Sequence, residues 1–187
     1  MKNQDKIVFC YIAHTVWLKG LIYFIEACNK VSLENIEIKI AGTINKDVLN
    51  YIDVNFDKHN IQFLGHVPNI NNFFRTSHVC VIPSLLDAGP ATVAEALYCG
   101  LPVITTQGCG SKTLIEDGKN GFVVPIADSN AIAKKMKWFI DNQDQIPKMS
   151  KYAVKSIASI DNSNQNEEFA KHIMVVVDRL KIEKGIL

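Results

Sequence analysis

The chain has no long apolar run and no excess of charge of either sign. None of its apolar stretches approaches the roughly 20 residues that a membrane-spanning helix needs. We also expect no signal peptide, because Met-Lys-Asn-Gln-Asp is not followed by an apolar segment of that type before the first expected strand. The chain has 20 lysines and arginines and 19 aspartates and glutamates, which gives a formal net charge of +1. Because nucleic-acid binding depends on clustered cations, this balance argues against nucleic acid as the main partner.

Cysteine pairs of the kind that bind metal or form disulfides are also missing. The five cysteines, at positions 10, 28, 80, 99 and 109, are odd in number, form no C-x-x-C and lie in or beside apolar segments. Neither they nor the five histidines have the spacing of zinc ligands. We therefore expect buried, reduced thiols in a cytoplasmic protein, with no metal and no cofactor.

Strand and helix signals alternate along most of the chain. Its 187 residues, 48% of them hydrophobic, suit one compact core. We expect strands at residues 7–12, 36–41, 61–64, 78–82, 102–105 and 121–124, and helices at 21–31, 47–59, 70–76, 91–98 and 131–141. This rhythm implies βαβ units and hence an α/β fold, with a doubly wound, mostly parallel six-stranded sheet covered by helices on both faces.

The C-terminal part of the chain has helix signals but no strand signal. Two helices are expected, at residues 146–160 and 167–184, on either side of a polar stretch at 161–166. We therefore divide the chain into a domain at 1–160 and a C-terminal helical segment at 161–187. This segment packs either on that domain or on an N-terminal domain outside the chain.

The stretch Pro83-Ser-Leu-Leu-Asp-Ala-Gly-Pro-Ala-Thr-Val-Ala-Glu-Ala96 leads from a buried strand into a helix. Pro90 suits the first helical position. In open α/β sheets, ligands bind at the carboxyl ends of the strands, and free N–H groups at a helix start favour phosphate. This turn is therefore a candidate binding site.

Two acids, Asp87 and Glu95, flank this turn with seven residues between them. Glu95 shares a helix face with Ala91 and Thr92, so its carboxylate could accept hydrogen bonds from the vicinal hydroxyls of a ribose, and Asp87 from those of a second sugar. Alternatively, Asp87 is a turn residue and Glu95 a solvated helix residue. The spacing alone does not separate these interpretations.

The stretch resembles the donor-site signature of retaining GT-B glycosyltransferases of the glycosyltransferase family 4 type, Pro-Ser-x-x-Glu-Gly-x-Pro-x-x-x-x-Glu-Ala. Asp87 stands for the usual Glu and Ala88 for the usual Gly. The resemblance implies that Glu95 holds the ribose and Asp87 a hydroxyl of the donor sugar. It also implies that the helix start, at Gly89, Pro90, Ala91 and Thr92, binds the donor's diphosphate.

Ala13-His-Thr-Val-Trp-Leu-Lys-Gly20 resembles the family's Gly-Arg-x-x-x-x-Lys-Gly, in which the Arg and the Lys bind the diphosphate. Lys19 matches the Lys, which makes it a third catalytic candidate. His14 stands at the Arg position as a donor-binding candidate, although an imidazole lacks the guanidinium fork.

Further segments in the expected order extend the resemblance over roughly residues 7–142. Gln62-Phe-Leu-Gly-His-Val-Pro68 resembles a segment whose backbone lies against the nucleotide base, which implies donor-binding roles for Gly65, His66 and Val67. Gly42 resembles the glycine that ends the second strand near the base. Cys99-Gly-Leu-Pro-Val-Ile104 matches a structural segment, and in residues 108–121 Thr113 replaces the family's usual Glu.

The resemblance implies an enzyme that transfers a sugar from a UDP-, GDP- or ADP-sugar to a glycan, lipid-linked or other acceptor. The transfer retains the anomeric configuration and needs no metal. It serves the synthesis of a surface polysaccharide or glycoconjugate. Only the Rossmann-like donor-binding half of the GT-B fold is matched. We therefore expect an acceptor-binding N-terminal domain or subunit as partner, peripheral membrane association only through that half, and no activity of this chain alone.

Two alternative functions fit the sequence to different degrees. The departures at His14, Ala88 and Thr113 leave open a degenerate nucleotide-sugar-binding module without transferase activity. A dinucleotide-dependent oxidoreductase fits less well, because the first strand–helix turn lacks G-x-G-x-x-G.

Overall fold

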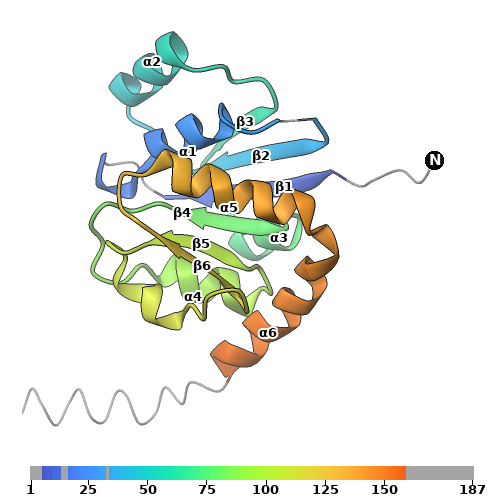
Figure 1. Cartoon of the computed structure of the whole chain (residues 1–187). Helices are drawn as coiled ribbons and strands as arrows, with labels where there is room; N and C mark the ends of the chain where they lie inside the picture. The colour runs from blue at the N-terminus through green and yellow to red at the C-terminus, as the bar shows by residue number, and fades with distance from the viewer. Residues whose placement is uncertain (1–5, 14–16, 33, 159–187) are drawn as a thin grey trace, which may run out of the picture. The chain divides into compact units, whose positions relative to one another are not determined.

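The computed structural model describes residues 6–13, 17–32 and 34–158. Its six strands are β1 (Ile7–Ile12), β2 (Ile36–Ala41), β3 (Ile61–Gly65), β4 (Val79–Ile82), β5 (Val103–Thr106) and β6 (Gly121–Val124). They form one sheet in the order β3-β2-β1-β4-β5-β6, and every neighbouring pair is parallel (Figure 1). The expected six-stranded, doubly wound sheet is therefore confirmed, and it is parallel throughout.

The helices are α1 (Leu21–Cys28), α2 (Lys46–Asn55), α3 (Ile70–Arg75), α4 (Ala91–Tyr98), α5 (Ser129–Asp141) and α6 (Ile146–Ala158). Short 3₁₀ turns, which the sequence did not predict, are η1 (Trp17–Lys19), η2 (Gly110–Leu114) and η3 (Gln143–Gln145). All expected helices in the described part are present, but α1 and α2 end earlier than predicted. At the end of α1, the Asn29 side chain donates to the Ile25 carbonyl (3.2 Å) and so competes with the next helical turn.

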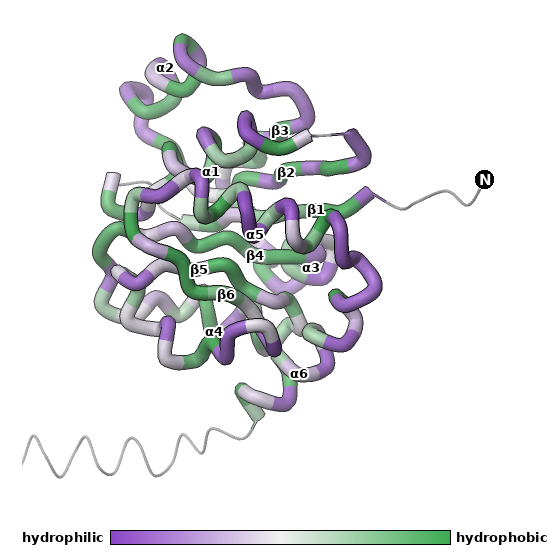
Figure 2. Tube along the Cα trace, in the orientation of Figure 1, coloured by the Kyte–Doolittle hydropathy of each residue, from purple (hydrophilic) through white to green (hydrophobic). Residues whose placement is uncertain are grey.

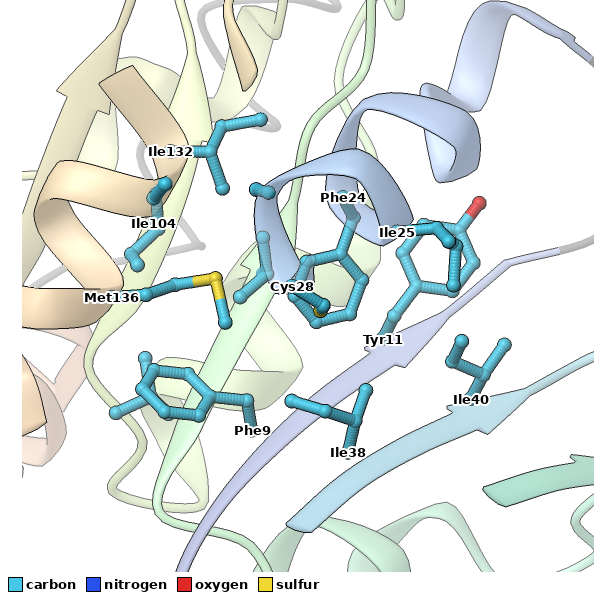
Figure 3. Packing of buried hydrophobic residues seen from close by; sticks show 14 of the residues in the cluster. Phe9, Tyr11, Phe24, Ile25, Cys28, Ile38, Ile40, Ile104, Ile132 and Met136 are labelled. Carbon is cyan, nitrogen blue, oxygen red and sulfur yellow. The ribbon is translucent and has the colours of Figure 1, made fainter. Parts of the chain in front are cut away.

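The buried residues form two cores, one on each face of the sheet. On β1, Phe9 and Tyr11 belong to one core and Cys10 to the other, because successive side chains of a strand point to opposite faces. The first core is closed by α1 and α5 (Figure 3), and Val48 and Ile52 of α2 also belong to it. The second is closed by α3 and α4. Figure 2 shows the same layering as hydrophobic strands with largely hydrophilic helices and loops around them.

Helix α6 contributes to both cores, with Met149 in the first and Ala153 in the second. This helix confirms most of the one expected at residues 146–160. The expected helix at 167–184 lies outside the described residues, as does the C-terminal segment at 161–187.

The five cysteines are free thiols, as expected. Four of them are buried and Cys99 is partly buried. Burial raises the pKa of Cys28 well above its ordinary value, so this thiol stays protonated. The cysteines therefore act as small apolar residues of the two cores.

Tyr11 generates a stability prediction. Its hydroxyl oxygen is buried and has no hydrogen-bond partner among the described residues, while its ring stacks on Phe24 at a centroid distance of 6.2 Å. Because an unpaired buried hydroxyl is costly, Tyr11→Phe should raise the free energy of unfolding by about 1 kcal/mol, as measured by urea denaturation. Tyr98→Phe, on a side chain that is 70% exposed, should change nothing. A loss of stability in Tyr11→Phe would show that a buried water serves the hydroxyl.

Candidate functional site

A cavity of about 430 Å³ opens where β1, β2 and β3 end and α4 begins. This is the carboxyl edge of the sheet, beside the point where the strand order reverses between β1 and β4 (Figure 1). Open α/β sheets bind their ligands at that place.

The cavity brings together seven of the residues proposed from the sequence: Lys19, Gly42, His66, Val67, Pro90, Thr92 and Glu95. Four other predicted residues do not line the cavity but neighbour a lining residue in the sequence or contact one: Gly65, Asp87, Gly89 and Ala91. His14 lies outside the described residues. Sequence reasoning missed Ile12, Ala13 and Ile70, which also line it. Their apolar side chains carry no chemical signal, although Ala13 directly follows a predicted strand.

Gly42 makes close backbone contacts that connect the loops around the cavity. Its φ is +111°, and a Cβ there would lie 1.9 Å from the Ala13 carbonyl oxygen. Its N–H donates to the Gly65 carbonyl at 2.7 Å, and the Ala13 N–H donates to the Ala41 carbonyl at 3.3 Å. The loops after the first three strands are therefore in direct backbone contact, which requires a residue without a side chain.

The position of Lys19 depends on a second close backbone approach. Gly20 has φ +71°, and a Cβ there would lie 1.9 Å from the Pro83 carbonyl oxygen. The Leu85 N–H donates to the Leu18 carbonyl at 2.8 Å. The turn that carries Lys19 is thus attached to the loop between β4 and α4.

Asp87 forms an ion pair with Lys19 across this contact. The Asp87 side chain is only 12% exposed and that of Lys19 is 30% exposed. The Asp87 backbone is fixed as well, since its N–H donates to the Gly108 carbonyl at 3.0 Å and its carbonyl accepts from Gly110 N–H at 2.8 Å. Asp87 therefore holds the ammonium group at the cavity edge, and its contact with a sugar stays a prediction.

Helix α4 points its N-terminus into the cavity. Pro90 is the N-cap, with ψ 125°, and not the first helical residue as predicted, because its extended ψ leaves the helix to begin at Ala91. The Ser111 hydroxyl donates to the Pro90 carbonyl at 3.1 Å and supports the turn. The first N–H groups of a helix have no intrahelical acceptor, so an anion is stabilised here. Glu95 lies one turn further on, exposed to the cavity.

Among the described residues, no group of three or more His, Cys, Asp or Glu side chains is placed to hold a metal ion. In the same part of the chain, no helix is both long and apolar enough to cross a bilayer.

A doubly wound parallel sheet, with a cavity at its carboxyl edge beside a helix start, defines a Rossmann-like α/β domain. The chain belongs to the family described as Glycosyl transferases group 1, whose model matches residues 1–156. Its fold is that of one half of a GT-B glycosyltransferase.

Among known proteins, the chain is similar to the capsular polysaccharide biosynthesis glycosyltransferase CapM of Staphylococcus aureus, at 25% identity over 145 residues that cover 75% of this chain and 38% of CapM. It is 24% identical over 148 residues to the UDP-Gal:alpha-D-GlcNAc-diphosphoundecaprenol alpha-1,3-galactosyltransferase of Escherichia coli, again with 75% of this chain and 38% of the relative covered. The chain thus spans about two fifths of the length of these relatives.

The chain also covers only part of the solved structures that it matches, about half of each. Anabaena HepE, crystallised in complex with UDP, matches with a TM-score of 0.79 at 18% identity, over 91% of this chain and 49% of HepE. WaaG, a glycosyltransferase involved in lipopolysaccharide biosynthesis, matches with a TM-score of 0.77 at 17% identity, over 91% of this chain and 48% of WaaG. At such identities the likeness establishes the fold.

Gly20 generates a second stability prediction, with a matched control. Gly118 has a similar φ of +75° but nothing within 4 Å of a Cβ, whereas Gly20 faces the Pro83 carbonyl. Gly118→Ala should cost about 1–2 kcal/mol for the left-handed backbone alone. Gly20→Ala should cost at least about 1 kcal/mol more, because overpacking is added. If urea denaturation shows equal losses of unfolding free energy in the two variants, the close approach of Gly20 to Pro83 is not a constraint.

Proposed function

We propose that this chain is the donor-binding half of a retaining glycosyltransferase. It binds a nucleoside diphosphate sugar in the cavity at the carboxyl edge of the sheet, and a separate N-terminal domain or subunit holds the acceptor. The observation that carries this proposal is the meeting of three groups in one cavity: the Lys19 ammonium, the start of α4 and the Glu95 carboxylate.

We assign each group a part of the donor. The backbone at Gly42 and at residues 65–67 faces the base, and His66 and Val67 form its side wall. Glu95 accepts the ribose hydroxyls. The N–H groups of Ala91 and Thr92, together with Lys19, face the diphosphate. HepE, which shares the fold, was crystallised with UDP and with UDP-glucose, which supports a uridine nucleotide as the first ligand to test.

The proposed chemistry is electrostatic. When the bond between sugar and phosphate breaks, negative charge develops on the leaving diphosphate, and Lys19 and the helix start stabilise it. Asp87 keeps the Lys19 side chain in place, so the cation is already oriented before the donor arrives. Transfer from the front face retains the configuration and needs no nucleophile from the protein.

The acceptor and the pathway follow from the relatives as proposals. CapM is named for capsular polysaccharide biosynthesis, and the Escherichia coli relative for an acceptor linked to diphosphoundecaprenol. We assign the chain to the synthesis of a surface polysaccharide or glycoconjugate in the cytoplasm. Because the acceptor site is expected in another domain, this chain alone should bind the donor without transferring the sugar.

A binding module without transferase activity is the second candidate. It is favoured by one observation, the ion pair between Lys19 and Asp87, which compensates the lysine charge before any phosphate arrives. Supplying the acceptor domain to the chain and assaying transfer separates the two candidates.

Calorimetric titration with UDP, GDP and ADP checks the binding site. One nucleotide should bind saturably, and Lys19→Ala and Glu95→Ala should each weaken its binding at least tenfold, which is about 1.4 kcal/mol. Lys6→Ala and Glu34→Ala remove the same charges from exposed positions away from the cavity and should leave affinity unchanged. Unchanged affinity in Glu95→Ala would refute the ribose assignment.

Asp87→Asn separates the two roles of that residue. Without the carboxylate, Lys19 loses the partner that orients it, so UDP should bind more weakly than to the unchanged chain, and equal or tighter binding would contradict the positioning role. If Asp87 also contacts the sugar, the difference in affinity between UDP-glucose and UDP should disappear. A loss of UDP affinity equal to that of Lys19→Ala would show that Asp87 acts only by positioning the lysine.

A further inference from the structure

A second and larger cavity, of about 680 Å³, lies at the opposite edge of the sheet. It is formed by the loop before β6, the end of α5 and one side of α6. Because α5 runs back from the carboxyl edge, its last residues lie at the amino edge, away from the donor cavity (Figure 1). The two cavities share no residue.

Four lysines line this second cavity. Lys148, Lys151 and Lys155 are spaced by three and four residues and therefore share one face of α6, and Lys119 reaches the cavity from the loop before β6. No acidic residue is among the described residues that line it. The three lysines of α6 form no ion pair with any described residue.

The acids nearby are already engaged. Glu116 accepts hydrogen bonds from Tyr152 at 2.7 Å and from Lys119 at 3.0 Å, and these bonds lower its pKa, so it remains ionised and paired. Asp141 pairs with Lys137 at 3.1 Å.

Asp117 and Asp144 are next in sequence to residues that line the cavity and accept hydrogen bonds from the Val123 N–H at 3.3 Å and from the Gln145 side chain at 2.7 Å, but neither lines the cavity itself. The lysines of the α6 face therefore have no ion-pair partner among the described residues.

Two aromatic side chains give the cavity an apolar wall. The ring of Trp138 packs edge-on against Phe122 at 5.0 Å and Phe139 at 5.2 Å, which holds it in place. Tyr152 is anchored by its hydrogen bond to Glu116. Fixed rings beside cations suit a ligand that has both a planar apolar body and a negative group.

We propose that this cavity is a second ligand site, for a small organic phosphate. The phosphate lies among Lys148, Lys151 and Lys155, and the apolar body rests against Trp138 and Tyr152. Lysine binds phosphate as a point charge, and an anion relieves the repulsion among neighbouring ammonium groups. The volume falls within the range of about 300–1,000 Å³ that is usual for small-molecule sites. The site is independent of donor binding, so either proposal can fail alone.

Pyridoxal 5′-phosphate is the probe, because it joins a planar ring, a phosphate and a lysine-reactive aldehyde. The aldehyde condenses with a lysine amine to an imine and releases water, and borohydride then reduces the imine to a stable amine. Mass spectrometry of the digested protein should find saturable labelling at Lys119, Lys148, Lys151 or Lys155, and excess inorganic phosphate should suppress it.

A matched pair of double variants tests the location. Lys148→Gln with Lys151→Gln should weaken saturable binding of the probe at least tenfold. Lys134→Gln with Lys137→Gln removes the same charge from exposed positions on α5 outside the cavity and should leave binding unchanged. Both should unfold at the same temperature as the unchanged chain. Lys19→Ala should bind the probe normally, which separates this site from the donor cavity.

Two results would overturn the proposal. Equal losses in the two double variants would mean that the probe reacts with surface lysines in general. Binding to phosphatidylglycerol vesicles that is lost in Lys148→Gln with Lys151→Gln, without saturable binding of the soluble probe, would assign this face to a lipid surface.

Discussion

Two contacts of backbone against backbone hold the donor cavity in shape. Gly42 lies against the Ala13 carbonyl and Gly20 against the Pro83 carbonyl, in both cases too close for any side chain. The first contact joins the loops that follow β1, β2 and β3, and the second sets the turn of Lys19 beside the loop of Asp87. Since loops are usually the most variable parts of a domain, these contacts explain how four of them form one cavity.

The sheet supplies the platform for these loops. Its two cores, closed by α1, α2 and α5 on one face and by α3 and α4 on the other, bury both sides of β1, β4 and β5. The carboxyl ends of β1, β2 and β3 are therefore held in register, and the helix that follows β4 starts beside them. A rigid edge of this kind pre-organises the groups that line the cavity, which lowers the cost of ordering them when a ligand binds.

The charge of the protein is close to balanced as a whole but not locally. At the donor cavity, Lys19 is offset by Asp87, so selectivity there depends on the helix start and on hydrogen bonds as much as on net charge. At the other edge of the sheet, the lysines of α6 stand without partners among the described residues. A formal net charge of +1 therefore conceals a difference between two cavities, one in which the lysine charge is compensated and one in which lysines accumulate.

Local sequence signals were enough to predict the six strands, their alternation with helices and seven of the residues that line the cavity at the carboxyl edge. Apolar runs and the turns that follow them are local signals, so β1, β2, β6 and α4 have the predicted bounds. The pairing of Asp87 with Lys19 and the lysine cavity became visible only in the folded chain. These depend on contacts between residues far apart in the chain, and no local pattern encodes such contacts.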